Sequence, residues 1–504
     1  MLQNLYEGYS YVPSDAAIKY KNSIINYGRL NEHLIECSKM FSCMNCATTV
    51  LIMMDKGVEI VIATISVFLS KNVFCILDKN ITEITFNEII EETKSSVIFT
   101  DLKNSKRIEK IAEQYKINIV VVDFNCETEE LSISQKNIYD IRRESNINID
   151  NSHIIYTSGS TSKPKGIICS RSSMWSFIKW EYNYLQLDSK VNVSQMSAPW
   201  FEPYLRDVFL ALFSGGCICI PTKREEFDPK AFYKFVEKMQ IDVLHIVPTL
   251  FRYLFFNEKL GEHNIKHILL AGEMLYGADV RKYYEKYDFG NLYNLYGPTE
   301  TTMAKFCYKI STKDQTDFRI KVGKPLPDTE FWLLNENGKL AENKQIGEVI
   351  ISTKQGTYGY LDKSMTKNVF GWLDDGTTIF KTGDIGYVDN EDNLELVGRK
   401  DYMQKIYGQK VYPEEIEGVI NICANVKKSM VFIDNNNKII ALIESNDYFD
   451  IDELVYTLTK NLIAYKHPHF IYVVENIPVN KSGKIDRNRF KSCSDINYKL
   501  KFII

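Results

Sequence analysis

Residues 154–166 read Ile-Ile-Tyr-Thr-Ser-Gly-Ser-Thr-Ser-Lys-Pro-Lys-Gly, an apolar strand end followed by a loop rich in hydroxyl groups. The last ten of these residues include five hydroxyl side chains, two lysines and two glycines. Hydroxyls and backbone N–H groups can surround phosphate oxygens, and glycine lets the backbone approach them closely. The Gly-Lys-Ser/Thr ending of a Walker A loop is absent. The stretch predicts phosphate binding where a strand ends, with a solvated Ser/Gly turn as the alternative for this stretch alone.

The pattern on both sides of this loop indicates an α/β fold. Short apolar runs at 50–54, 96–100, 117–122, 242–247 and 267–271 are separated by helical stretches such as 58–69. This alternation favours parallel sheets covered by helices. From about Gly347, short strands at 348–352, 378–380 and 394–397 are separated by Gly, Asp and Asn, which favours an antiparallel, β-barrel-like section.

The end of the chain has a different pattern of expected elements, with helices at 413–420 and 451–462 and strands at 429–432 and 439–442. We therefore expect two domains. Residues 1–399 would form a large domain of two parallel-sheet α/β subdomains plus the barrel-like section. Residues 400–504 would form a small α+β C-terminal domain.

Composition excludes several classes of protein. The 504 residues hold 61 Lys plus Arg and 65 Asp plus Glu, so there is no basic surplus for binding nucleic acid. Hydrophobic residues make up 45% and charged residues 25%, which excludes a mostly disordered chain. No apolar run reaches the ~20 residues of a membrane span, and the first residues lack the basic and apolar regions of a secretory signal. The eleven scattered cysteines, the Cys43–Cys46 pair included, indicate reduced, packed thiols and a cytoplasmic location.

Further motifs occur in a fixed order along nearly the whole chain, and together they resemble the adenylate-forming (ANL) superfamily. That superfamily includes acyl-CoA synthetases, luciferases and the adenylation domains of nonribosomal peptide synthetases. With the loop at 157–166, the matching stretches are 25–30 (Ile-Asn-Tyr-Gly-Arg-Leu), 294–302 (Asn-Leu-Tyr-Gly-Pro-Thr-Glu-Thr-Thr), 381–384 (Lys-Thr-Gly-Asp), 398–408 with 413–417, and 480–487 (Asn-Lys-Ser-Gly-Lys-Ile-Asp-Arg). The chain departs from the family at Ser162, at Met403-Gln404 and at Leu396.

The resemblance implies that the chain binds ATP and Mg²⁺. Glu300 would hold the Mg²⁺, because a hard cation prefers carboxylate oxygen. Asn294 would bond adenine, the ring of Tyr296 would face the base, and Asp384 would bind both ribose hydroxyls. The full implied ATP/AMP site is Thr157, Ser158, Gly159, Ser160, Thr161, Lys165, Asn294, Leu295, Tyr296, Gly297, Pro298, Thr299, Asp384, Arg399 and Lys484.

Two further roles are implied near the C-terminus. Lys484 resembles the family's catalytic lysine, a flexible point charge that reaches the α-phosphate and the carboxylate during adenylation. Asp401 resembles the hinge about which a mobile small domain turns. Gly408 resembles the glycine that lines a tunnel for the acceptor thiol, where a side chain would block a pantetheine arm.

The stretch 196–209 indicates the class of substrate, because it resembles the motif of amino-acid-activating domains. There Glu202 aligns with an aspartate that pairs with the substrate ammonium. Arg206 lies four residues on and could pair with Glu202 instead, or bind an acidic group of the substrate. The rest of the implied pocket is small or aliphatic: Thr249, Leu269, Ala271, Leu295, Met303 and Ala304.

These residues favour a two-step ligase that activates an amino acid as an acyl-adenylate, releases pyrophosphate and passes the acyl group to a thiol. No carrier domain is visible after Ile504, so we expect the acceptor in trans, as an acyl or peptidyl carrier protein, in a layout similar to D-alanine–carrier protein ligases. An acyl- or aryl-CoA ligase, with CoA as the acceptor, is the alternative. A nucleotide-binding protein without ligase activity is a third reading, against which Lys484, Glu300 and Asp384 weigh.

Overall fold

The computed structural model describes residues 12–41, 48–136, 150–157, 164–187, 190–256, 264–287, 290–342, 344–406, 409–423, 425–434, 436–445, 449–479, 485–487, 498 and 500–503. Several residues named above lie outside these ranges: Cys43, Cys46, Ser158, Gly159, Ser160, Thr161, Ser162, Gly408 and Lys484.

A seven-stranded sheet carries the strand that leads into the phosphate loop. Its order is β7-β6-β5-β3-β4-β8-β9, parallel in the centre and antiparallel in the edge pairs β6–β7 and β8–β9. The strands are β3 (Thr49–Met53), β4 (Val73–Ile76), β5 (Val97–Thr100), β6 (Asn118–Asn125), β7 (Glu130–Lys136), β8 (Asn151–Thr157) and β9 (Lys165–Ser170). Helices α2 (Val58–Leu69), α3 (Glu83–Thr93) and α4 (Leu102–Tyr115) connect its parallel strands.

A nine-stranded sheet follows the same plan, in the order β16-β15-β14-β13-β12-β10-β11-β1-β2. Its strands are β1 (Ala16–Tyr20), β2 (Ser23–Asn26), β10 (Asn192–Ser194), β11 (Cys217–Ile220), β12 (Val243–Ile246), β13 (His267–Ala271), β14 (Asn291–Tyr296), β15 (Phe306–Lys309) and β16 (Lys324–Pro325). Its helices are α1 (Tyr27–Ser38), α5 (Arg171–Tyr184), α6 (Pro203–Phe213), α7 (Lys223–Phe227), α8 (Pro229–Met239), α9 (Pro248–Phe256) and α10 (Gly277–Tyr284). Short 3-10 turns are η2 (Lys39–Phe41), η3 (Thr299–Thr301) and η4 (Thr312–Thr316).

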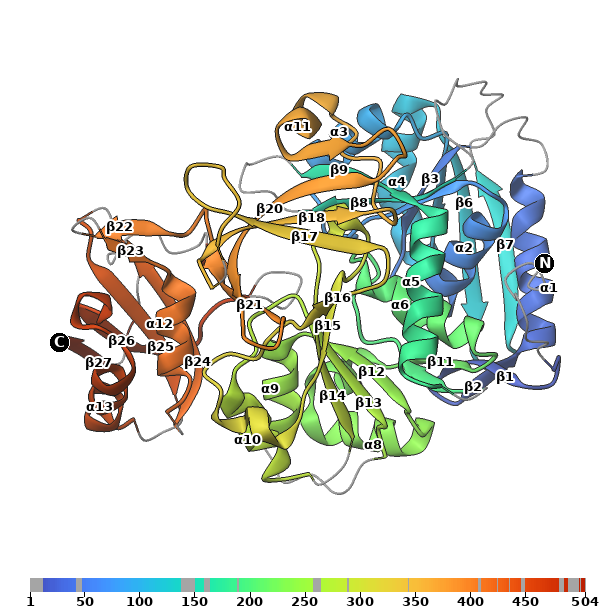
Figure 1. The fold of residues 1–504 in the computed structure, drawn as a ribbon. Coiled ribbons are helices and arrows are strands. Elements are labelled where there is room, and N and C mark those ends of the chain that lie inside the picture. The colour runs from blue at the N-terminus through green and yellow to red at the C-terminus, as the bar shows by residue number, and fades with distance from the viewer. Residues whose placement is uncertain are drawn as a thin grey trace.

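One hydrophobic core joins the two large sheets. Val50 and Ile52 of β3 belong to the same buried cluster as Val193 of β10 and Ile218 of β11. Helix α2 is apolar on almost every side, as expected for a helix packed within a core. Helices α5 and α6 run side by side through the centre of this body (Figure 1).

A five-stranded antiparallel sheet forms the predicted barrel-like section. It contains β17 (Thr329–Leu334), β18 (Gly347–Thr353), β19 (Phe370–Trp372), β20 (Thr378–Val388) and β21 (Leu394–Arg399), with helix α11 (Lys363–Val369). Strand β20 is longer than the sequence predicted. Gly383, at φ +73°, takes a backbone conformation that other residues seldom adopt, so the strand continues through a bulge instead of ending.

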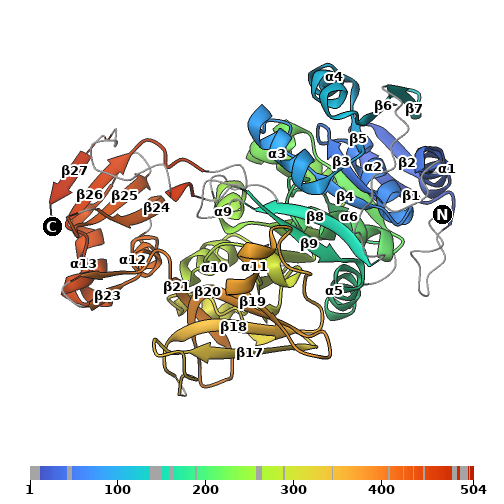
Figure 2. The same ribbon diagram turned by 90° about the horizontal axis from the view of Figure 1, so that it is seen from above.

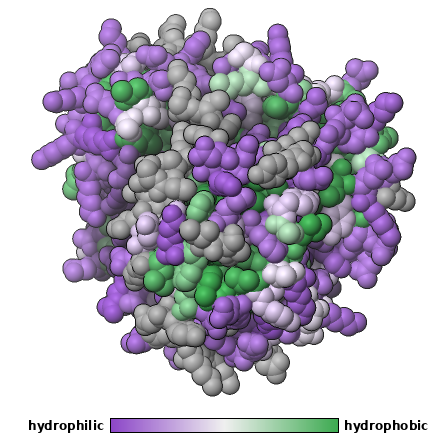
Figure 3. All heavy atoms as spheres, turned by 90° about the vertical axis from the view of Figure 1, so that its left-hand side faces the viewer, coloured by the Kyte–Doolittle hydropathy of each residue, from purple (hydrophilic) through white to green (hydrophobic). Residues whose placement is uncertain are grey.

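The last part of the chain forms its own sheet, in the order β24-β25-β26-β27, with its own hydrophobic clusters. Its elements are the hairpin β22 (Gln404–Ile406) and β23 (Gln409–Val411), β24 (Val426–Ile433), β25 (Ile439–Ser445), β26 (Phe470–Val474), β27 (Leu500–Ile503), α12 (Pro413–Ile420), α13 (Ile451–Asn461) and η5 (Ala464–Lys466). This sheet stands apart from the two large ones (Figure 2). On the face of the molecule where this C-terminal part lies, the surface is mostly hydrophilic and includes a cluster of hydrophobic side chains (Figure 3).

Helix α12 is one of the elements through which this part contacts the rest of the chain, and Lys410 of β23 also pairs with Glu336. A Cβ at Gly418 would lie 2.6 Å from Tyr276 and 2.7 Å from Phe318, so the absent side chain permits the close approach. The predicted fold class, with parallel-sheet α/β subdomains and a smaller C-terminal part, is confirmed. Among the described helices, none has both the length and the apolar character needed to cross a membrane.

Candidate active site

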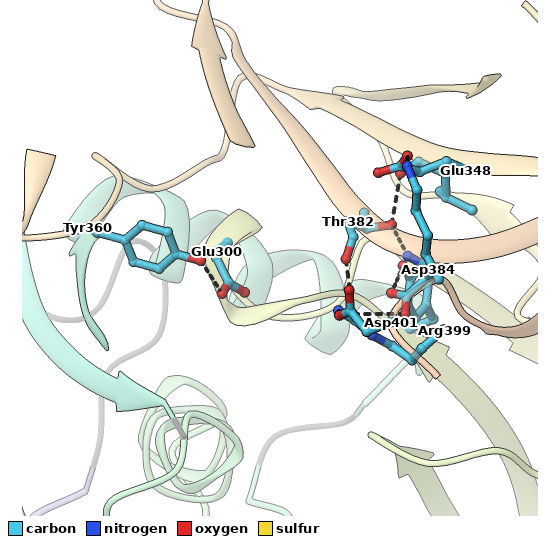
Figure 4. A network of polar contacts seen from close by, with 10 residues as sticks. Glu300, Glu348, Tyr360, Thr382, Asp384, Arg399 and Asp401 are labelled. Atoms are coloured by element: carbon cyan, nitrogen blue, oxygen red, sulfur yellow. Dashed lines mark hydrogen bonds and ion pairs between the residues drawn. The ribbon is translucent and has the colours of Figure 1, made fainter. Parts of the chain in front are cut away.

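The pairing of β20 with β21 brings the predicted ribose-binding carboxylate onto a scaffold of hydrogen bonds. Asp384 lies opposite Arg399 in the register. One oxygen accepts a bond from the Tyr296 hydroxyl at 2.5 Å. The other accepts a bond from Arg399 Nη1 at 3.1 Å (Figure 4). Burial raises the pKa of the Asp384 carboxyl, and the nearby Arg399 opposes that shift. The carboxylate is therefore held in one orientation by two partners before any ligand arrives.

Arg399 also reaches the residue predicted to be the hinge. Its Nη2 donates to Asp401 Oδ2 at 2.8 Å, while Nη1 donates to the Thr382 carbonyl at 3.0 Å. The next residue, Lys400, pairs with Glu348 of β18 at 2.7 Å. The start of the C-terminal part is thus tied by two ion pairs to the sheet that carries Asp384 (Figure 4).

The stretch from Asn294 to Thr299 runs from the end of β14 to the first residue of η3. The side chain of Asn294 is buried and donates both amide hydrogens, to the carbonyls of Ile320 at 3.1 Å and Lys321 at 3.0 Å. Those bonds leave its oxygen as the atom suited to accept from the amino group of a base. A Cβ at Gly297 would lie 2.5 Å from the Met303 carbonyl, which explains the glycine between Tyr296 and Pro298.

Glu300 lies in η3 and is held by two residues of the stretch 357–360. Its Oε1 accepts a bond from the Tyr360 hydroxyl at 2.8 Å (Figure 4), and its backbone carbonyl accepts from Thr357 Oγ1 at 2.7 Å. Lys165, the first residue after the loop, places its Nζ 5.6 Å from the centre of the Tyr360 ring. Sequence reasoning missed Tyr360, which lies in an irregular stretch with no motif of its own. The structure brings the predicted Mg²⁺ ligand and the loop lysine to the same ring.

Glu202, the predicted ammonium partner, is 6% exposed and lies just before α6. Its Oε1 accepts the Met303 N–H at 2.9 Å. Burial raises the pKa of the Glu202 carboxyl to about 8, although that bond and the charge of Lys305 oppose the shift. Among the described residues, none places a cation at ion-pair distance from this carboxylate.

The backbone that holds this contact is unusual. Thr302 and Met303 have φ of 64° and 58°, the left-handed region that residues other than glycine seldom adopt. Such conformations persist where the surroundings enforce them and are frequent at functional sites. Here they direct the Met303 N–H at Glu202. The residue that follows the nucleotide motif is therefore hydrogen-bonded to the side chain predicted to bind the substrate ammonium.

The expected alternative pairing of Glu202 with Arg206 is wrong. Arg206 forms a two-pronged ion pair with Glu181 of α5, and both side chains are buried. His245, at the end of β12, bonds Asp207 through Nδ1 at 2.7 Å and lies 3.3 Å from Glu181 through Nε2. Burial and the charge of Arg206 lower the pKa of His245, but Glu181 and Asp207 outweigh them and raise it. Arg206 balances the buried charge of Glu181, so that carboxylate is compensated inside the network. His245 stands inside the apolar run 243–247, and that placement is the sequence signal for a buried polar group, whereas Glu181 lies in a stretch of mixed polarity.

Most of the predicted pocket residues belong to the large hydrophobic core. Leu269, Leu295, Met303 and Ala304 share the central hydrophobic cluster, with Ala271 packed against it. Thr249 is not part of that cluster, and its backbone N–H donates to Glu273 at 2.7 Å.

Glu202 also belongs to a group of three side chains that could hold a metal ion. His153, Cys169 and Glu202 are buried, with ligand atoms within 4.8 Å of one another. Burial lowers the pKa of His153 to about 3, so its imidazole is neutral. A nitrogen–sulfur set does not suit Mg²⁺, which prefers oxygen ligands such as Glu300.

Comparisons with known proteins place this geometry in a family. The AMP-binding enzyme family matches residues 10–361. The D-alanine–D-alanyl carrier protein ligase of Bacillus licheniformis is 30% identical over 359 residues, 68% of this chain and 71% of the relative. The zwittermicin A synthase ZmaJ of Bacillus cereus is 26% identical over 494 residues, 94% of this chain and 91% of the relative.

Other relatives are much longer or share the fold at lower identity. The chain spans only 7% of bacitracin synthase 3 of Bacillus licheniformis, at 25% identity over 94% of this chain. The O-succinylbenzoate coenzyme A synthetase of Bacillus subtilis, solved with AMP, has the same fold, with a TM-score of 0.76, 20% identity and coverage of 95% of this chain and 96% of that one. The extent of the family match and the identity to the carrier protein ligase establish that the chain belongs to the AMP-binding enzyme family.

Proposed function

We propose that this chain joins an amino acid to AMP and then passes the aminoacyl group to the thiol of a carrier protein in trans. The observation that carries the amino-acid part is Glu202. It is a buried carboxylate, joined through Met303 to the nucleotide motif, and no described residue is ion-paired with it. A buried carboxylate is costly unless a cation compensates it. The ammonium group of an amino acid supplies that cation.

In the first step an oxygen of the substrate carboxylate bonds to the α-phosphorus of ATP, and the bond to the β-phosphate oxygen breaks to release pyrophosphate. Thr157, the loop at 158–161 and Lys165 would hold the departing phosphates, Asp384 the ribose, and Asn294 the base. Glu300 fits a Mg²⁺ ligand because one of its oxygens is oriented by Tyr360 and the second is left for the ion. When bound, the ion would neutralise phosphate charge.

In the second step the acceptor sulfur bonds to the acyl carbon, and AMP leaves with the electrons of the broken bond. We propose residues 400–504 as the small domain that turns about Asp401 between the steps. Breaking the Arg399–Asp401 and Lys400–Glu348 contacts would then accompany the turn.

Asp384→Asn is expected to raise the KM for ATP about 10- to 100-fold. The amide would present a donor where the ribose hydroxyls also donate, and it would lose the charge that Arg399 balances. The KM of ATP–pyrophosphate exchange measures this effect. Asp389→Asn, also in this section of the chain but bonded to Asn393 and Lys321, is the matched control and should leave the KM for ATP unchanged.

The KM for the amino acid is expected to rise as the pH falls. Only the ionised Glu202 can pair with an ammonium, and its pKa is raised to about 8. Below that pH the ionised fraction falls about tenfold per pH unit, so the KM rises by up to about tenfold per unit. The substrate lacking the amine should show no such trend, and an equal trend for both substrates would contradict the assignment.

A CoA ligase is the second candidate, favoured by the likeness to the coenzyme A synthetase fold. The two candidates differ in the acceptor and are separated by product analysis. Incubation of the enzyme, ATP and the activated acid with CoA, or with a phosphopantetheinylated carrier protein, should give a thioester only with the carrier.

A further inference from the structure

The described residues on either side of the segment that carries Lys484 form a fixed base. Val479 and Ile485 form an antiparallel bridge on either side of residues 480–484, and the Asp486 N–H donates to the Pro478 carbonyl at 3.0 Å. Ile485 packs against the hydrophobic cluster that includes Met430 and Ile477. The residues on either side of 480–484 are therefore held next to each other.

A two-pronged ion pair completes that base. Arg487, three residues after Lys484, donates Nη1 to Glu417 Oε1 at 2.7 Å and Nη2 to Glu417 Oε2 at 2.5 Å. Nη1 also reaches the Val431 carbonyl at 3.2 Å, and the Val431 N–H donates to Glu417 Oε1 at 2.7 Å. The Glu417 side chain is 5% exposed and that of Arg487 19%. Parallel charge-assisted bonds fix direction as well as distance.

The Arg487 guanidinium also lies close to the predicted hinge and to helix α12. Its carbon lies 5.4 Å from the centre of the Tyr402 ring, one residue after Asp401. Glu417 belongs to α12, and a Cβ at the next residue, Gly418, would lie 2.6 Å from Tyr276 and 2.7 Å from Phe318. Arg487 thus connects the base of the lysine loop to the hinge and to the helix that faces the large domain.

We propose that the Glu417–Arg487 pair positions Lys484 for adenylation. This inference rests on the proposed function, in which Lys484 is the cation that meets the α-phosphate. A lysine on a flexible stem loses much side-chain entropy when it is held at one place. A fixed loop base removes part of that cost, and a displacement of about 1 Å can lower a rate by about 100-fold. Glu417 and Arg487 are positioning residues, because they act through Lys484 and need not touch the substrate.

The test is a double-mutant cycle with Glu417→Gln and Lys484→Ala. Glu417→Gln keeps the shape of the side chain and removes its charge. We expect it to lower the kcat of ATP–pyrophosphate exchange about 10- to 100-fold with the KM for ATP little changed. In the Lys484→Ala background it should cause no further loss, since the residue it positions is gone. Arg487→Lys should restore part of the rate that Arg487→Gln loses.

Glu415→Gln is the matched control. Glu415 is on the same helix and accepts bonds from Lys466, and not from Arg487, through both oxygens, at 2.8 and 2.7 Å. It should leave exchange unchanged. The probe is the acid that gives the fastest wild-type exchange among the proteinogenic amino acids and β-alanine.

Hydrogen–deuterium exchange of the peptide containing residues 485–487 gives a second measurement that needs no substrate. Faster exchange in Glu417→Gln, and not in Glu415→Gln, is expected. Unchanged kcat, or an equal loss with and without Lys484, would overturn the positioning role. Absence of exchange in the wild type with every acid would instead count against the proposed function, and the deuterium result would still report on the ion pair.

Discussion

Lys484→Ala is expected to lower the rate of adenylate formation about 100- to 1000-fold. Both reactants of that step are anions, and charge builds on the α-phosphate as the carboxylate approaches it. Removing a cation that acts only as this charge develops lowers kcat and leaves ground-state binding nearly intact. Single-turnover formation of the adenylate, measured with saturating ATP, gives the rate directly.

Two controls separate this effect from unfolding or lost binding. The KM for ATP should stay near the wild-type value, because the proposed ribose and base contacts at Asp384 and Asn294 are distant from Lys484 in the sequence and belong to other elements. Transfer of an acyl group from a supplied adenylate to the thiol should also persist. A variant that forms the adenylate at the wild-type rate would remove Lys484 from the mechanism.

Glu202→Gln is expected to raise the KM for the amino acid about 30- to 5000-fold, which corresponds to about 2–5 kcal/mol for truncating one partner of a buried charge pair. The amide keeps the bond from Met303, since its oxygen can still accept, so the local fold should survive. The same substitution should change the KM of the deaminated acid by much less. Exchange kinetics with the two substrates measure the difference.

The matched control is Glu181→Gln, a buried carboxylate that pairs with Arg206 and not with the predicted substrate. It is expected to lower the Tm, because it leaves Arg206 without its countercharge. It should affect both substrates alike. Equal effects of Glu202→Gln on the amino acid and on its deaminated analogue would make Glu202 a structural residue.

Elements with strong apolar or helical patterns could be predicted from the sequence alone. The apolar run at 58–69 and the helix at 413–420 form α2 and α12 at the predicted bounds. Strand β20 was predicted too short because its glycine reads as a turn, whereas pairing with β18 and β21 carries the strand onward. Tertiary pairing overrode a local signal there.

The candidate site could also be predicted only in part. Motif order predicted that Asp384, Tyr296 and Arg399 belong together, and their hydrogen bonds join them. The partner of Arg206 could not be predicted, because Glu181 is 25 residues away and reaches it only when α5 packs on α6. The four-residue spacing from Glu202 to Arg206 favours an ion pair between them on a helix. Arg206 pairs with Glu181 instead.

The most direct measurement is ATP–pyrophosphate exchange across amino acids, β-amino acids, aryl acids and short fatty acids. We expect exchange driven by one amino acid or a few related ones, lost in Lys484→Ala and weakened below about pH 8 in step with the ionisation of Glu202. Exchange driven only by acids without an amine would contradict the amino-acid assignment.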